Sequence, residues 1–346
     1  MSTPALVAHP HTPFRRVVVV GVALAAVLSV ILLAFLWPTV TSSVKALPIA
    51  IAAPAEQADQ LAGALEERSP GAFDVTTVAD RATAVDLIET RQAYGAIVLG
   101  SDPEVMTASA ASPLVAQLLT GFAPVLAAQL NAAAAAQGIA LPAPLIVTVT
   151  DVVPLASTDA RGLGLASSSF PLVLGGMIGG IAVSLAIVGV WRRVTATLIY
   201  SAVGGLAITG ILQGWFGALQ GDYFVNAAAV ALTILGIAGT IVGCVSLFGR
   251  PGIAVGPVLF LFIANPISAA AQPVEFLTAP WGAIGQWFPP GAAATLLREL
   301  SYFPRADTLF PWLVLAGWAV LGLLLSTLGH YRDRGAATQA ALAAAE

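Results

Sequence analysis

The chain has 346 residues, of which 58% are hydrophobic and only 9% are charged. Soluble domains carry about 25% charged residues, so this composition excludes an ordinary soluble protein and predicts an α-helical integral membrane protein. The net charge of −4 gives no basic surface for a nucleic acid, and the single cysteine, Cys244, excludes an intrachain disulfide bond.

Residues 1–16 form a short polar arm that ends in Arg15 and Arg16. Residues 17–37 are an unbroken apolar run, and about 20 apolar residues at 1.5 Å each cross the roughly 30 Å hydrocarbon core of a bilayer. A cleaved signal peptide would have a shorter apolar core and a cleavage site with small residues. Here Pro38 follows at once, so we expect an uncleaved transmembrane helix over 17–37.

Residues 38–165 differ in kind, with twelve acidic residues between Glu56 and Asp159. A serine before a proline, at Ser112 and Pro113, predicts a helix start, and Pro124 predicts a kink in that helix. Strands are expected at 47–53, 73–78, 94–100 and 145–153, and helices at 54–68, 81–90 and 113–137. This alternation predicts a small α/β domain with a mainly parallel sheet, inserted between the first two transmembrane helices.

Residues 166–335 return to membrane composition, and Asp222 is the only charge between 194 and 248. A charge at the bilayer centre costs about 2.5–3.5 kcal/mol on insertion scales, so long uncharged runs indicate spans. We expect five of them, at 170–191, 194–216, 224–248, 253–271 and 309–328, followed by a tail at 336–346. With the first helix this makes six transmembrane helices.

The arginines predict the orientation of these spans. Seven arginines that flank the spans lie in the connections that share one side: Arg15, Arg16, Arg192, Arg193, Arg250, Arg332 and Arg334. The positive-inside rule places that side in the cytoplasm. We therefore expect both termini to be cytoplasmic and the α/β domain to be extracytoplasmic.

Glycines within the spans recur at GxxxG spacing, which lets helices pack closely in lipid. Two interpretations remain open, which are packing inside one bundle and a homodimer seam. The pairs are Gly175/Gly179, Gly176/Gly180, Gly210/Gly214, Gly239/Gly243 and Gly252/Gly256.

The segment 265–303 is apolar but broken by five prolines, so it cannot be one straight spanning helix. We expect an external re-entrant hairpin at about 272–303 with two short helices. It either seals the outer end of the bundle or lines the exit of a substrate path, with Glu275 and Arg298 as a candidate ion pair. The candidate residues of this outer gate are Glu275, Trp281, Trp287, Pro289, Pro290 and Arg298.

Motifs for chemistry are scarce. Ser42 and Lys45 match S-x-x-K, but the companion motifs of that catalytic class are absent and Lys45 also fits an interface anchor. No P-loop, HExxH, CxxC or GxSxG sequence occurs, so we expect neither an enzyme nor a cofactor. The spans also lack the carboxylate or histidine that proton-coupled carriers use, and the polar residues there are neutral, such as Gln213 and Asn226.

The layout and two stretches resemble a known family. NPISAAAQPVEFL (265–277) followed by PWGAIGQWFPPGAAATLLRELSYF (280–303) is similar to ABC-2 type membrane permeases, closest to the branch of the phage infection protein and YhgE-type proteins. The external run with FDVTTV and YGAIVLG also resembles that branch. The resemblance covers nearly the whole chain through its order of elements.

This resemblance implies a multi-pass protein of the bacterial cell membrane, present as a homodimer or paired permease. A separate ATP-binding subunit would drive it, engaging a cytoplasmic coupling turn at Arg192 and Arg193, and the exported substrate would be lipid-like or amphipathic. Two departures are a short arm without an amphipathic helix and a short turn at 191–194. They favour the alternative, a non-transport envelope scaffold, secretion accessory or phage-docking protein.

Overall fold

A computed structural model of the chain describes residues 12–138 and 142–343, with side chains described as far as Arg332. Most of the expected arm, and the end of the expected tail, lie outside these residues. Within them, six helices are long and apolar enough to cross a membrane, as the composition predicts for a helical membrane protein. They are Phe14–Val40, Pro113–Ala136, Leu163–Ala186, Val190–Trp215, Tyr223–Phe248 and Leu309–Arg332.

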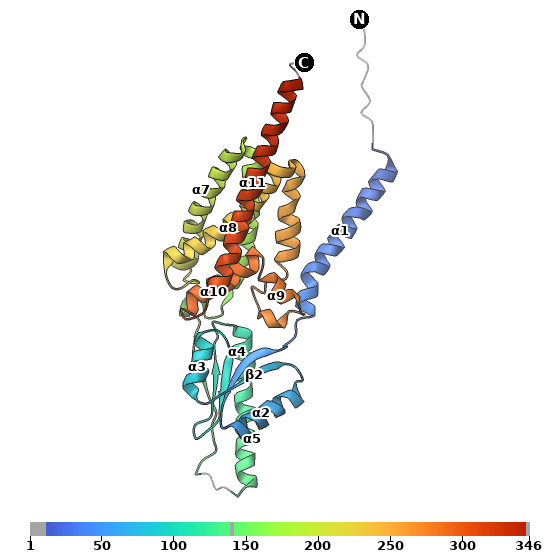
Figure 1. Cartoon of the computed structure of the whole chain (residues 1–346). Helices are drawn as coiled ribbons and strands as arrows, with labels where there is room; N and C mark the ends of the chain where they lie inside the picture. The colour runs from blue at the N-terminus through green and yellow to red at the C-terminus, as the bar shows by residue number, and fades with distance from the viewer. Residues whose placement is uncertain (1–11, 139–141, 344–346) are drawn as a thin grey trace.

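Four long helices form a bundle around α8, most of which is buried. Its neighbours α6, α7 and α11 all pack against α8, and the bundle occupies the upper half of Figure 1. Their bounds are α6 (Leu163–Ala186), α7 (Val190–Thr209, continued by the π-helix η2, Gly210–Trp215), α8 (Tyr223–Phe248) and α11 (Leu309–Ala343).

Two membrane elements differ in length from the sequence prediction. The fifth expected span, 253–271, is a shorter helix formed by η3 (Arg250–Ala254) and the π-helix η4 (Gly256–Ala264). Pro251 and Pro257 lie at the starts of these pieces, and each proline removes a backbone donor from a regular α-helical ladder. The last span continues to Ala343, so the part of the expected tail that is described is helical.

Close helix packing inside this one chain accounts for many of the spaced glycines. A Cβ at Gly180 would lie 2.9 Å from the backbone of Ala238 in α8, and one at Gly243 would lie 2.6 Å from Gly322 O in α11. The first interpretation, packing within one bundle, therefore holds at these positions. A Cβ added at Gly214 would have no atom within 4 Å, so nothing in the bundle requires a glycine at that position.

A five-stranded sheet with order β2-β1-β3-β4-β5 lies between α1 and α6 in the sequence. All neighbours pair in parallel except β3 and β4, so the expectation of a mainly parallel sheet is confirmed. The strands are β1 (Leu47–Ala52), β2 (Phe73–Val78), β3 (Gly95–Val98), β4 (Glu104–Thr107) and β5 (Thr148–Asp151). Strand β4 was not expected, because four residues that include a carboxylate give little periodicity.

Four helices flank this sheet: α2 (Ala55–Arg68), α3 (Arg81–Glu89), α4 (Pro113–Thr120) and α5 (Phe122–Ala136). Ser112 caps α4 as expected, since its Oγ accepts a hydrogen bond of 3.3 Å from Val115 N. The sequence prediction of a kink at Pro124 is wrong, because the helix breaks at Gly121, between α4 and α5. Pro124 lies in the first turn of α5, where a helix does not need its N–H.

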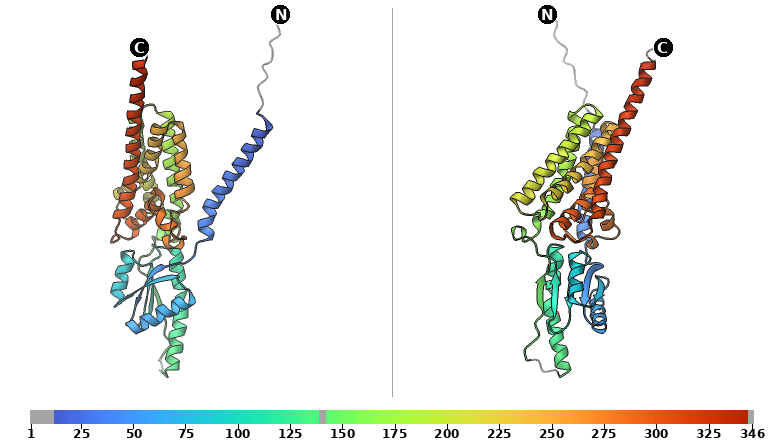
Figure 2. Two further views of the ribbon diagram at one scale, coloured as in Figure 1. Left: turned by 45° about the vertical axis from the view of Figure 1, so that its right-hand side comes forward. Right: turned by 60° about the vertical axis from the view of Figure 1, so that its left-hand side comes forward.

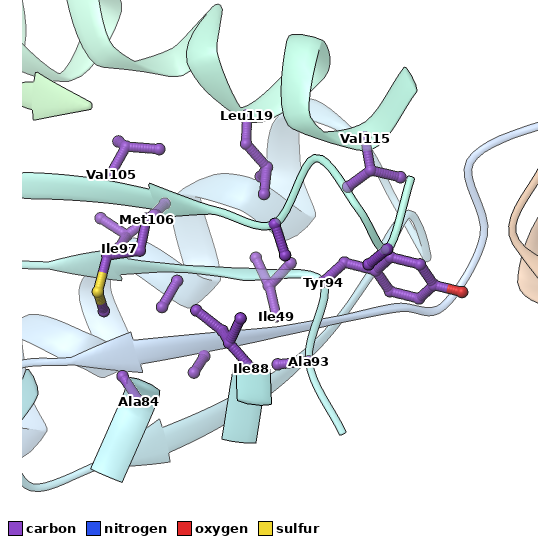
Figure 3. Packing of buried hydrophobic residues seen from close by; sticks show 14 of the residues in the cluster. Ile49, Ala84, Ile88, Ala93, Tyr94, Ile97, Val105, Met106, Val115 and Leu119 are labelled. Carbon is purple, nitrogen blue, oxygen red and sulfur yellow. The ribbon is translucent and has the colours of Figure 1, made fainter. Parts of the chain in front are cut away.

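Helices α4 and α5 are apolar enough to be counted among possible spans, but they cover the sheet. Val115, Leu119 and Leu126 are buried in one cluster with Ile49 and Ile97 of the strands. Figure 3 shows Leu119 and Val115 above the strands that carry these residues. Burial against the sheet, rather than against lipid, explains the apolar composition of this helix pair.

Helix α1 (Phe14–Val40) diverges from the bundle and has no buried residue. Figures 1 and 2 show it as a separate rod that meets the rest of the chain only near the junction of bundle and sheet. It continues past Pro38, where the sequence prediction ended the helix, as far as Val40. Pro38 has no N–H to donate to the carbonyl of Ala34, so the helix loses one backbone hydrogen bond there. The short segment after it leads directly into β1.

Candidate functional site

The broken segment lies between the bundle and the sheet, where it contacts both (Figure 1). It contains a 3-10 turn, η5 (Val274–Phe276), and the two expected short helices, α9 (Trp281–Gly285) and α10 (Pro289–Tyr302). Pro289 and Pro290 occupy the first positions of α10, where proline is favoured, and both are buried. We call residues 272–303 the hairpin.

The hairpin contributes side chains to two separate hydrophobic clusters. Leu296 and Leu297 are buried in the bundle together with Ile234 of α8. Phe276 and Phe303, at 4% and 1% exposure, belong to the cluster that fills the sheet. The hairpin is therefore a shared part of both cores, and the two halves of the molecule cannot separate without exposing it to solvent.

A tyrosine just before β3 holds the start of the hairpin. Tyr94 Oη donates a hydrogen bond of 2.9 Å to Glu275 Oε2, and Tyr94 is 8% exposed. Burial raises the pKa of this phenol well above its ordinary value, and the Glu275 carboxylate raises it further. The phenol therefore keeps its proton and remains a donor. Figure 3 shows the Tyr94 hydroxyl at the edge of the sheet cluster, pointing away from it.

A buried ion pair holds the other end of the hairpin. Arg91 Nη1 lies 2.8 Å from Glu299 Oε1, and their side chains are 13% and 10% exposed. The Arg91 guanidinium also lies 6.0 Å from the centroid of the Phe303 ring, within range of a cation–π contact. Arg91 has φ of 60°, in the left-handed position after α3 that glycine usually fills. Arg91 therefore forms the ion pair from a left-handed backbone conformation that side chains other than glycine rarely adopt.

Arg298 is 9% exposed and donates to two backbone carbonyls instead of to a carboxylate. Its Nη1 donates to Ala111 O at 3.3 Å and its Nη2 to Ala270 O at 3.1 Å. The candidate pair of Glu275 with Arg298 is therefore not formed. Helix α10 directs Arg298 toward the loop before α4, whereas η5 places Glu275 beside Tyr94.

A further charged contact lies at the surface of the same junction. Arg305 donates to Glu89 Oε2 at 2.7 Å and also to Asp86, both on α3. These side chains are half exposed, and such pairs contribute about 0–1 kcal/mol each. The contact fixes the loop after α10 rather than adding much stability.

The two tryptophans of the expected gate do not face one another. Trp281 is 47% exposed and faces α1, whereas Trp287 is 63% exposed beside α11. The Trp287 carbonyl accepts a hydrogen bond of 2.8 Å from Trp318 Nε1. The six candidate gate residues therefore lie in several different environments and do not form one constriction.

The candidate coupling turn lies at the end of the bundle opposite the sheet (Figure 1). Arg193 Nε donates to Ile187 O at 2.7 Å and so holds the turn between α6 and α7, while Arg192 is exposed. Arg250 lies at the start of η3, and Arg332 Nη1 donates to Leu247 O at 2.7 Å, at the same end. Arg192, Arg193, Arg250 and Arg332 therefore lie at the same end of the bundle.

Sequence reasoning did not single out Arg91, Tyr94, Glu299 or Arg305. Each is an ordinary residue near an element end, and only the fold brings it to the hairpin. Ser42 Oγ donates to Gln272 Oε1 at 3.0 Å, and no hydrogen bond joins it to Lys45 among the described residues. Over the same residues no group of three or more His, Cys, Asp or Glu side chains could hold a metal ion.

No family model matches this chain, no curated protein matches it, and no solved structure matches its fold.

Proposed function

We propose that this chain is the membrane-spanning permease subunit of an ATP-driven exporter, energised by a separate ATPase chain. The exported substrate is lipid-like or amphipathic. In this proposal the chain resides in a bacterial cell membrane with both termini in the cytoplasm. The sheet and its helices form an extracytoplasmic α/β domain inserted between the first two crossings.

The observation that carries the proposal is the shared hairpin. Leu296 and Leu297 join α10 to the bundle, while Phe276, Phe303 and the Arg91–Glu299 pair join the same segment to the sheet. Any movement of bundle helices at that end must therefore be transmitted to the external unit. A permease that opens outward needs such a connection between its spans and its outer surface.

The end of the bundle that carries Arg192, Arg193 and Arg250 is the proposed docking surface for the ATPase chain. The exposed Arg192, the pinned Arg193 and Arg250 face the side where an ATPase chain would dock under the positive-inside rule. The turn from α6 to α7 is short, so the proposed partner pushes on helix ends rather than on a long cytoplasmic loop. Charge on this surface then selects an acidic partner surface.

The test is recovery of the partner from native membranes. The tagged full-length chain is crosslinked and purified, and the eluate is examined for a nucleotide-binding subunit and for ATP hydrolysis. We expect an ATPase chain with the wild type and its loss with Arg192→Glu, while Arg16→Glu, at another charged connection, retains it. Absence of any ATPase from the wild-type eluate would overturn the ATP-driven proposal.

The alternative, a non-transport scaffold or docking protein, is favoured by a cleft on the sheet. The cleft, of about 530 Å³, lies at the carboxyl ends of β1, β2 and β3, which face away from the hairpin. Parallel sheets bind their ligands at this edge. Thr77→Trp would block the cleft, so loss of a captured partner with transport intact would favour the scaffold over the permease.

A further inference from the structure

An open apolar groove of about 570 Å³ separates α1 from the rest of the molecule near the junction with the sheet. This volume lies within the range of about 300–1,000 Å³ that is usual for small-molecule sites. Figure 2 shows the gap between α1 and the bundle into which the groove opens. Its walls include Val30, Leu33, Ala34 and Trp37 from α1, with Ile263 and Trp281 on the opposite side.

The groove is apolar along its length and polar at one end. At the end nearest the sheet, Thr278 Oγ1 donates a hydrogen bond of 3.3 Å to Thr41 Oγ1, which in turn donates to Trp37 O at 2.7 Å. Both hydroxyl oxygens therefore remain as acceptors for a head group that carries hydroxyl or ammonium donors. Ser42 Oγ donates to Gln272 just beyond them. The groove therefore matches a ligand with a long apolar part and a polar end, not one that is apolar throughout.

The position of the groove indicates where that ligand comes from. The groove follows the second half of α1, a helix with no buried residue that is apolar enough to cross a membrane. Trp37 and Trp281 lie near its polar end, and tryptophan concentrates where hydrocarbon meets head groups. The open side thus faces acyl chains and the polar end lies at head-group depth.

We propose that this groove binds one glycerophospholipid of the surrounding bilayer, with an acyl chain between α1 and η4 and the head group at Thr41 and Thr278. A spanning helix of a second copy is 10–12 Å wide with its side chains, so it would have to push the two walls apart. An acyl chain is much thinner and follows the groove as it stands. The site requires only that the chain spans a bilayer, and it does not depend on transport.

The test uses the full-length chain in nanodiscs of phosphatidylglycerol and phosphatidylethanolamine that contain a trace of phosphatidylglycerol with a diazirine on its acyl chain. After illumination, labelled peptides are mapped by mass spectrometry. We expect label concentrated on the groove walls around Ala34 and Ile263. Ala34→Trp fills the groove, and we expect groove labelling to fall about tenfold, which corresponds to 1.4 kcal/mol.

Ala26→Trp is the matched control, because Ala26 is exposed on the same helix outside the groove, and we expect its labelling to equal that of the wild type. Equal unfolding midpoints of the two variants show that both are folded. Unchanged groove labelling in Ala34→Trp, or uniform labelling along α1, would overturn the site. So would efficient disulfide dimers of Ala34→Cys in a Cys244→Ala background, because a second copy would then fill the groove.

Discussion

Tyr94 and Glu275 are 181 residues apart in the sequence, and one hydrogen bond of 2.9 Å joins the hydroxyl of the first to the carboxylate of the second. The bond fastens the edge of β3 to the turn that opens the hairpin. With Arg91–Glu299 it makes two polar attachments, one on each side of α9. The connection between sheet and bundle therefore consists of apolar packing together with two polar contacts that fix the position of the hairpin on the sheet.

Tyr94→Phe should destabilise the protein by about 1.5–3 kcal/mol, the usual contribution of a hydrogen bond to a charged group. The phenylalanine keeps the buried ring but leaves the Glu275 carboxylate without its donor. Thermal unfolding of Tyr94→Phe, of Glu275→Leu, whose side chain has no acceptor, and of the double variant measures the coupling energy. Tyr331→Phe, at a tyrosine that is 69% exposed, is the control and should be neutral. Additive losses in the cycle would refute the bond.

Arg91→Met should cost about 3–5 kcal/mol, because it leaves the Glu299 carboxylate buried without its ion-pair partner. Adding Glu299→Leu should recover most of that loss, since two apolar side chains replace two buried charges. Denaturant unfolding in detergent gives both values. A double variant that is less stable than either single variant would contradict this account of the pair.

Gly285→Ala should destabilise the hairpin by about 1–3 kcal/mol, as overpacking does in other tightly packed sites. A Cβ there would collide with the backbone carbonyl of Ile267, which a side-chain movement cannot relieve. Gly317→Ala in α11 is the control, because no atom lies within 4 Å of its added methyl. The control should be neutral or stabilising by up to about 1 kcal/mol. Limited proteolysis across 265–288 reports the local loosening.

The sheet should become less stable in acid through Glu104. Its carboxylate accepts two hydrogen bonds from Arg81, which hold its pKa below the ordinary value of 4.5. A depressed pKa in the folded state contributes stability above pH 4.5 that is lost as the pH falls through the folded pKa. Glu104→Gln should flatten this part of the curve of unfolding midpoint against pH.

Half of Arg81 is exposed, so the contribution of this pair at neutral pH should be no more than about 1 kcal/mol. Glu67→Gln, at an exposed carboxylate of α2, is the control for removing one charge from the same unit. If Glu104→Gln and Glu67→Gln give the same pH curve, the Arg81 contact does not stabilise the fold.

The orientation can be measured with single cysteines in a Cys244→Ala background. Ser101→Cys, on the sheet side, should react with a membrane-impermeant maleimide on intact cells. Val188→Cys, which is 82% exposed in the turn between α6 and α7, should react only after permeabilisation. The reverse pattern would place the sheet in the cytoplasm and contradict the proposed orientation.

The sequence was most informative where a pattern repeats over many residues. Uncharged runs located the long helices, and strand–helix alternation located four of the five strands and the helical stretch after Ser112, although not its break at Gly121. The cap at Ser112 and the short helices of the hairpin followed from local chemistry of serine and proline. These features depend on neighbours in the sequence, so a single chain is enough to predict them.

The contacts of the candidate site could not be predicted in the same way. The sequence suggests a pair of Glu275 with Arg298 because both are charged and near in sequence, yet Glu275 accepts from Tyr94 beside β3 and Arg298 donates to Ala111 O in the loop before α4. Strand β4 was missed because it has only four residues and begins with Glu104. The ion pair with Arg81 that permits burial of this carboxylate becomes visible only in three dimensions. Long-range partners are decided by the fold as a whole.

The place of Phe276 and Phe303 in the sheet cluster has a consequence for the order of synthesis. All five strands leave the ribosome long before these two side chains, so the nascent sheet must wait with an open apolar end while four more helices are made and inserted. Contacts between such distant parts of a chain form slowly, and an unfinished core exposes surface that favours aggregation. A chain that stalls before the hairpin therefore has a sheet whose apolar cluster lacks Phe276 and Phe303 and stays open at that end.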